Sequence, residues 1–179
     1  MIEIIPNWHP IFVHFTVALL TTAGVLTVFA VLLPATAELR RQLETVARWN
    51  LWIGFGFAIA TVFAGWVAYS TVVHDDVSHL AMRGHRNMAM TTISIYLAVF
   101  FWSVTRHWQR QPANIAFAAL LLVATGCLAV TGFRGGELVY RYGVGVMALP
   151  DRATRSPAVP AAPAAAAEPA THDHAAAGH

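Results

Sequence analysis

Four long apolar segments limit what this chain can fold into. They span residues 11–33, 49–73, 88–105 and 113–133, and they cover nearly half of the sequence. A helix needs about 20 apolar residues to cross a bilayer. The segments do not alternate as strands would, and a backbone in lipid must satisfy its own hydrogen bonds. The sequence therefore predicts an all-α integral membrane protein, a bundle of four spanning helices.

The composition excludes several other classes of protein. Hydrophobic residues make up 57% of the chain and charged residues 11%, whereas a soluble domain carries about 25% charged residues. The pI of about 9.1 rests on a net charge of only +2, and no basic segment is interleaved with aromatics, so we expect no nucleic-acid binding. Cys127 is the single cysteine, which excludes an intramolecular disulfide and covalent c-type haem. Recognisable catalytic motifs are missing too, so an enzyme is the least favoured class.

The chain divides into a membrane domain, residues 1–150, and a tail, residues 151–179. The tail is rich in alanine and proline and has no aromatic residue, which predicts disorder. His172, His174 and His179 lie in it, and they could capture Cu²⁺ or Zn²⁺ weakly. The first apolar segment lacks the basic start of a signal peptide and should remain as a span. The third helix could also begin earlier, near residue 77, with Asp75, Asp76 or Ser78 as its N-cap.

Arginines in the loops suggest an orientation. Four spans put both ends of the domain on one side of the membrane. The first and third loops carry five arginines, against four in the second loop and just past the last span, and the richer side is expected to be cytoplasmic. We therefore predict a multi-pass protein of the bacterial inner membrane with both termini outside. The five are Arg40, Arg41, Arg48, Arg106 and Arg110.

The same topology brings histidines together at one face. Five of the nine histidines fall at that face, with the segment 135–140 beside them. Ionisable groups near the hydrocarbon are costly and are therefore functional candidates. The five are His9, His14, His74, His79 and His85.

The leading hypothesis is a b-type haem between the first and third helices. His14 lies inside the first span, and a neutral imidazole at that depth suits either a hydrogen bond to a neighbouring helix or an iron ligand. We expect His85 to be the opposite ligand, and Arg86, with Arg83, to pair with the haem propionates. His9 lies five residues from His14, about 140° around a helix, and is expected to be interfacial or supporting.

The end of the fourth helix enters the same hypothesis. Glycines at 132, 135 and 136 are expected to stop the helix near residue 133. The chain after Gly136 would then fold back, so that Tyr140 covers the edge of the haem. Two imidazole ligands leave no open position on the iron, so such a centre would pass electrons, to a quinone or a redox protein.

Two other interpretations stay open. The first is copper or zinc handling, because imidazole together with thioether suits Cu(I); its ligands would be His79, Met82, His85 and Met88. The second is a structural or assembly subunit without a cofactor, whose histidines only bond helices together.

Three motifs in order resemble a known family. They are His9-Pro10-Ile11-Phe12-Val13-His14-Phe15, then His85-Arg86, then residues 136–146. They resemble bacterial four-span membrane proteins known only as a domain of unknown function (number twenty-two thirty-one), over residues 7–147. The resemblance implies a layout similar to small cytochrome b-type bundles, and some relatives are joined to electron-transfer modules. Thr16 departs from the pattern, since proline is common there. The motif positions carried over are His9, His14, His85, Arg86, Gly136, Tyr140 and Gly143.

Overall fold

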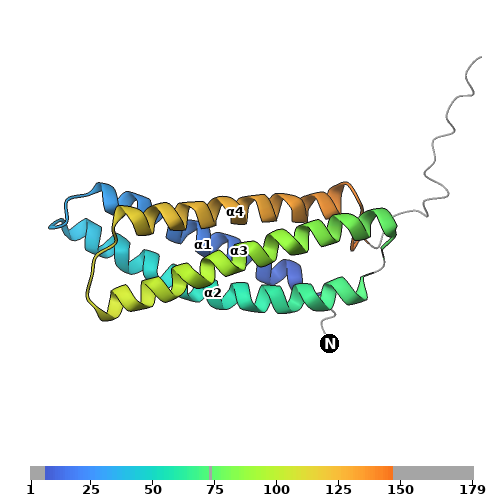
Figure 1. Cartoon of the computed structure of the whole chain (residues 1–179), viewed down its shortest axis with the longest axis horizontal. Coiled ribbons are helices and arrows are strands. Elements are labelled where there is room, and N and C mark those ends of the chain that lie inside the picture. Colours follow the sequence, from blue (N-terminus) through green and yellow to red (C-terminus); the bar gives the residue numbers. More distant parts are fainter. Residues whose placement is uncertain (1–6, 73, 147–179) are drawn as a thin grey trace, which may run out of the picture. The chain divides into compact units, whose positions relative to one another are not determined.

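The structure, a computed structural model, describes residues 7–72 and 74–146 and consists of four helices in that part. They are α1 (His9–Leu32), α2 (Glu38–Thr71), α3 (Asp76–Trp108) and α4 (Ile115–Tyr140). Successive helices run in opposite directions (Figure 1), and α1 and α3 each pack against both α2 and α4. Helices α1 and α3 therefore stand diagonally opposite each other. The predicted tail, with its histidines, lies outside the described residues.

The outside of the bundle is as apolar as its interior. Large apolar side chains that are more than half exposed include Phe29, Phe63, Trp66, Phe101, Leu122 and Phe133. Fully buried ones include Leu20, Leu51, Tyr96, Val99 and Leu121. An apolar exterior of this extent is stable only in lipid, and all four helices are long and apolar enough to cross a membrane. The predicted all-α membrane bundle is confirmed.

Local sequence explains where three helices begin. Pro10 stands in the first turn of α1, where its missing N–H costs nothing. The Asp75 side chain accepts from the Ser78 N–H at 2.9 Å, and the Ser78 hydroxyl accepts in turn from the Asp75 N–H at 2.9 Å. This capping box selects Asp75 among the three N-cap candidates and confirms the earlier start of α3. At α4, Asn114 accepts from the Phe117 N–H at 2.9 Å.

All four helices are longer than the predicted apolar segments, although α1 is longer by a single residue. Helix α2 begins at Glu38 rather than residue 49, and α3 begins at Asp76 rather than residue 88. The apolar criterion recognises only the part of a helix that lies in hydrocarbon, so it misses polar turns that continue the same helix beyond it.

The prediction that glycines stop α4 near residue 133 is wrong. The helix continues through Gly135 and Gly136 to Tyr140. Glycine inside a helix costs only about 1 kcal/mol relative to alanine, which the continuing backbone hydrogen bonds and packing outweigh. The turn comes at Gly143, whose φ of 65° is left-handed and whose N–H bonds to the Val139 carbonyl at 3.0 Å.

Replacing the N-cap of α4 tests this account of its start. Asn114→Ala should lower the free energy of unfolding by about 1 kcal/mol, because the Phe117 N–H loses its acceptor. Asn114→Asp keeps an acceptor and is the matched control. Thermal unfolding in detergent measures both, and equal midpoints for the two variants would contradict the capping role.

Candidate functional site

The five predicted histidines do meet at one end of the bundle. This histidine end, where α1 and α3 begin and α2 and α4 finish, carries His9, His14, His74, His79 and His85. It corresponds in Figure 1 to the start of the blue helix and the end of the orange one. The side chains nevertheless divide into two groups, because some face the interior and others face outward.

His9 of α1 points into the bundle and is held by α2. Its Nδ1 lies 2.9 Å from the backbone carbonyl of Thr61. A carbonyl can only accept, so Nδ1 carries the proton and Nε2 keeps a free lone pair. Gly65, one turn along α2, makes room for the ring, because a Cβ there would stand 2.9 Å from His9 Cε1. A hydrogen bond that sets the tautomer in this way is typical of a histidine that ligates a metal.

His85 of α3 occupies the corresponding position diagonally across. Its ring packs against α4, where a Cβ on Gly135 would stand 3.3 Å from Cε1. The carbonyl of Thr131 lies near the ring, and His85 interacts electrostatically with His9 and with Arg134. Its Nδ1 is buried, and no group in the described residues forms a hydrogen bond with it. The two imidazoles thus lie on diagonal helices at the same end of the bundle, each packed beside a glycine.

Hydroxyl groups separate this pair from the apolar core. Thr16 of α1 and Thr61 of α2 share a hydrogen bond of 2.8 Å, and Thr92 of α3 and Thr131 of α4 share another of 2.8 Å. Each bond joins two neighbouring helices one or two turns inward from the histidines. These four hydroxyls therefore satisfy one another in pairs, as low-dielectric surroundings require.

The structure places His9 inside the bundle and His14 on its outside, which is the reverse of the expected arrangement. His14 is exposed on the outer surface, and its Nδ1 lies 2.5 Å from the carbonyl of Pro10 in its own helix. The interior stripe of α1 contains Thr16, Ala23 and Ala30, all buried. His9 continues that seven-residue spacing by one more step, whereas His14 does not. The interior pair is thus His9 with His85, and the spacing was the signal that could have identified it.

Other predicted residues lie away from the pair. Arg83 is exposed, and Arg86 places its guanidinium 5.0 Å from the centre of the Tyr69 ring. Tyr140 is 93% exposed at the end of α4, because the helix does not turn back, and it cannot cover a bound group in this position. Gly136 is half-buried, and a Cβ there would touch nothing within 4 Å.

Sequence reasoning missed Arg134 as a site residue. It projects from α4 towards α3, so that a Cβ on Gly84 would stand 3.4 Å from its Nη1. No carboxylate of the described residues forms an ion pair with Arg134. Arg134 therefore fits the role that the haem hypothesis gave to Arg83 and Arg86, which was to pair with the propionates.

The proposed copper ligands His79, Met82, His85 and Met88 have different surroundings in the structure. Both ring nitrogens of His79 are in use, Nδ1 to His74 Nε2 at 2.9 Å and Nε2 to the Tyr69 hydroxyl at 3.3 Å. Met82 is buried and Met88 is half-buried along α3. In the described part of the chain, no three His, Cys, Asp or Glu side chains form a group that could hold a metal ion.

Comparison with protein families supports the membrane assignment. A family model described as predicted membrane protein (DUF2231) matches residues 6–148, which is the whole four-helix region. The chain belongs to this DUF2231 family. The match confirms the resemblance carried by the three motifs, and the family's description names a membrane protein without naming an activity. No curated protein and no solved structure matches the chain.

The packing of His9 on α2 can be tested with two glycines. Gly65→Ala should lower the unfolding midpoint, because the added Cβ displaces the ring and breaks its bond to Thr61, and overpacking of this kind costs about 1–3 kcal/mol. Gly56→Ala on the same helix is the matched control, since a Cβ there meets nothing within 4 Å. The control should be neutral or stabilising by up to about 1 kcal/mol. If both variants unfold at the same temperature, the close packing of His9 is refuted.

Proposed function

We propose that this DUF2231 protein binds a b-type haem at the histidine end and carries electrons within the membrane. One observation carries the proposal: two half-buried imidazoles, His9 and His85, lie at the same end of the bundle on the diagonal helices α1 and α3, each packed against a neighbouring helix. Neutral imidazole is a common axial ligand of haem iron. Burying a pair of ionisable groups inside a spanning bundle costs free energy, which makes the pair a candidate for function.

The donor chemistry of the two residues fits such a ligand pair. The Thr61 carbonyl holds His9 in the tautomer that leaves Nε2 free to bind a metal. His85 has a buried Nδ1 without a hydrogen-bond partner in the described residues, and a small rotation towards the nearby Thr131 carbonyl would give it the same support. Both rings would then present Nε2, each oriented by the carbonyl of an adjacent helix.

The groups around His9 and His85 also bear on how a haem would be held. Gly65 and Gly135 let the two imidazoles pack closely against α2 and α4, which would fix the positions of the ligand rings. Arg134 has no carboxylate partner in the described residues, and a guanidinium matches the geometry of a propionate. The bonds of Thr16 with Thr61 and Thr92 with Thr131 limit how far such a group could extend into the core.

A haem held by two imidazoles supplies one-electron transfer between ferric and ferrous iron. The residues of this chain would orient the ligands, balance the propionate charge and exclude water from the pair. A quinone in the bilayer or a redox protein at the histidine end would be the partner. Copper or zinc at this end, or a bundle without a cofactor, are the competing outcomes of the experiment.

A reduced-minus-oxidised absorption spectrum tests the haem proposal. The protein should be purified in detergent after expression with ample haem supply, with metals measured in the same sample. The wild type should show sharp reduced-haem bands, which His9→Ala and His85→Ala should each abolish. His14→Ala should keep them, because that ring lies outside the bundle, and it is the matched control.

Three results would contradict the proposal. A colourless wild type without metal favours a structural subunit, and bound copper or zinc without haem favours metal handling. Bands that are lost in His14→Ala but kept in His9→Ala would overturn the assignment of the ligand pair.

We infer further that the histidine end faces the outside of a bacterial inner membrane. Within the membrane domain, five arginines at the opposite end against four at the histidine end support this orientation. Alkaline phosphatase fused after residue 146 should then be active, because the enzyme folds only outside, and green fluorescent protein fused there should be dark. The reverse pattern would invert the orientation without affecting the haem proposal.

A further inference from the structure

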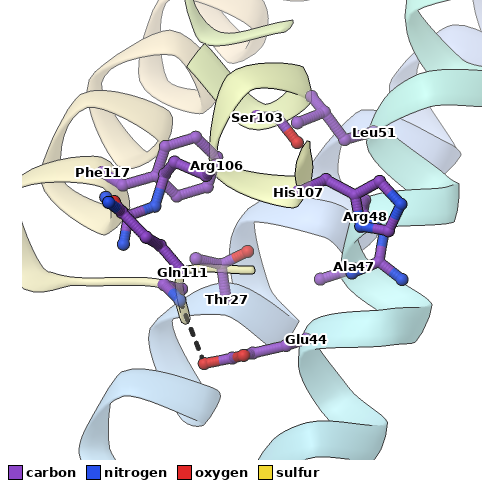
Figure 2. A pocket seen from close by; sticks show the side chains of 11 residues that line it. Thr27, Glu44, Ala47, Arg48, Leu51, Ser103, Arg106, His107, Gln111 and Phe117 are labelled. Carbon is purple, nitrogen blue, oxygen red and sulfur yellow. Dashed lines mark hydrogen bonds between the residues drawn. The ribbon is translucent and has the colours of Figure 1, made fainter. Parts of the chain in front are cut away.

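The opposite end of the bundle contains a cavity lined by arginines. At this arginine end, where α1 and α3 finish and α2 and α4 begin, a cavity of about 50 Å³ lies between α2, α3 and the start of α4. Figure 2 shows Arg48 beside His107 on one side of it and Arg106 beside Phe117 on the other. His107 and Gln111 are exposed, so the cavity reaches the surface.

Arg106 is the least accessible charge at this end. Its exposed fraction is only 9%, and its Nε is buried without a hydrogen-bond partner in the described residues. One terminal nitrogen donates to the carbonyl of Pro112, which anchors the guanidinium beside the cavity. The permanently charged side chain of Arg106 is thus more than nine-tenths buried, and its Nε donor has no partner in the described residues.

Arg48 repeats the pattern from α2. Its Nε is also buried without a hydrogen-bond partner in the described part of the chain. Its guanidinium carbon lies 5.9 Å from the centre of the Trp52 ring, a cation–π contact that holds the side chain but leaves its charge uncompensated. Two arginines from different helices therefore line one cavity, and each has a buried Nε without a hydrogen-bond partner in the described residues.

The carboxylate in the cavity lining is already engaged. Glu44 Oε1 lies 2.9 Å from Arg40 Nε and accepts from the Ala113 N–H at 3.2 Å. The described ion pairs are Arg40–Glu44, Arg41–Glu38 and Arg141–Glu137, and none includes Arg48 or Arg106. Arginine cannot lose its proton in a protein, so the buried charge of Arg106 and the half-buried charge of Arg48 favour an anion from outside the chain.

We propose that this cavity binds a phosphate group. Guanidinium forks match the oxygens of a phosphate, and Gln111 and the Ser103 hydroxyl add donors along the lining. The cavity is small, at about 50 Å³, and it opens to the surface, so a phosphate group could enter it from outside. The site is far from His9 and His85, at the other end of the helices, and it does not rest on the haem proposal.

The depth of the cavity fits two sources of phosphate. Trp49 is 52% exposed and Trp108 is 78% exposed on the outer surface at this end, and tryptophan marks the level of the lipid headgroups. A terminal phosphate of an anionic lipid and a free phosphate from the aqueous side can both reach this level. Basic pockets between helices are a known way of holding lipid phosphates.

Two binding experiments on the full chain in an uncharged detergent separate these sources. The first follows thermal unfolding with inorganic phosphate against chloride at equal ionic strength, and the second follows native mass spectrometry with phosphatidic acid against phosphatidylcholine. Binding of inorganic phosphate alone identifies a free anion, and binding of phosphatidic acid identifies a lipid. Either result supports the site, and phosphatidylcholine should fail because its choline does not fit.

Variants tie the binding to the two arginines. Arg48→Gln and Arg106→Gln should each weaken binding at least about tenfold, as the loss of one charge-assisted contact predicts. Arg106→Lys keeps the charge and serves if the glutamine variant fails to fold. Arg41→Gln removes an exposed arginine of the same end and should bind as the wild type does.

The proposal is overturned if neither ligand binds the wild type. It is equally overturned if Arg48→Gln and Arg106→Gln both bind as tightly as Arg41→Gln, because the contact would then be general surface attraction.

Discussion

The requirement that polar groups be satisfied without water governs this structure. Lipid surrounds the middle of the bundle, so a donor or acceptor there must find a partner inside the protein. The hydroxyls of Thr92 and Thr131 meet this requirement by pairing between helices at 2.8 Å. Groups that cannot be paired in this way are confined to the two ends, and the chemistry of the protein is confined with them.

The two ends carry different kinds of polar group, which suit different ligands. The histidine end turns neutral imidazoles inward, and a free lone pair on His9 suits a metal centre. The arginine end turns permanent cations inward, and the unused donors of Arg48 and Arg106 suit an anion. The apolar core from Leu20 to Leu128 lies between them, so the two proposed sites are structurally independent.

The number of helices and their topology followed from the sequence, because they depend only on the length of each apolar segment and on the number of segments being even. An apolar segment of about 20 residues crosses the bilayer once, and four crossings return the chain to the side where it began. The gathering of His9, His74 and His85 at one end follows from the same count. Helix ends were harder to predict, because Gly135 and Gly136 allow a turn but do not force one, and only the packing of α4 decides against it.

The sequence by itself thus determined the class of fold and which residues share an end of the bundle. It could not decide which side of each helix faces inward, because α1 is apolar all round and lipid accepts either face. Only contacts between helices settle that rotation, by seating His9 against Gly65 and leaving His14 on the surface. The buried donors of Arg106 were equally invisible in the sequence, since an arginine in the last turn of a helix normally reaches the headgroups or water, and only the neighbouring helices close it in.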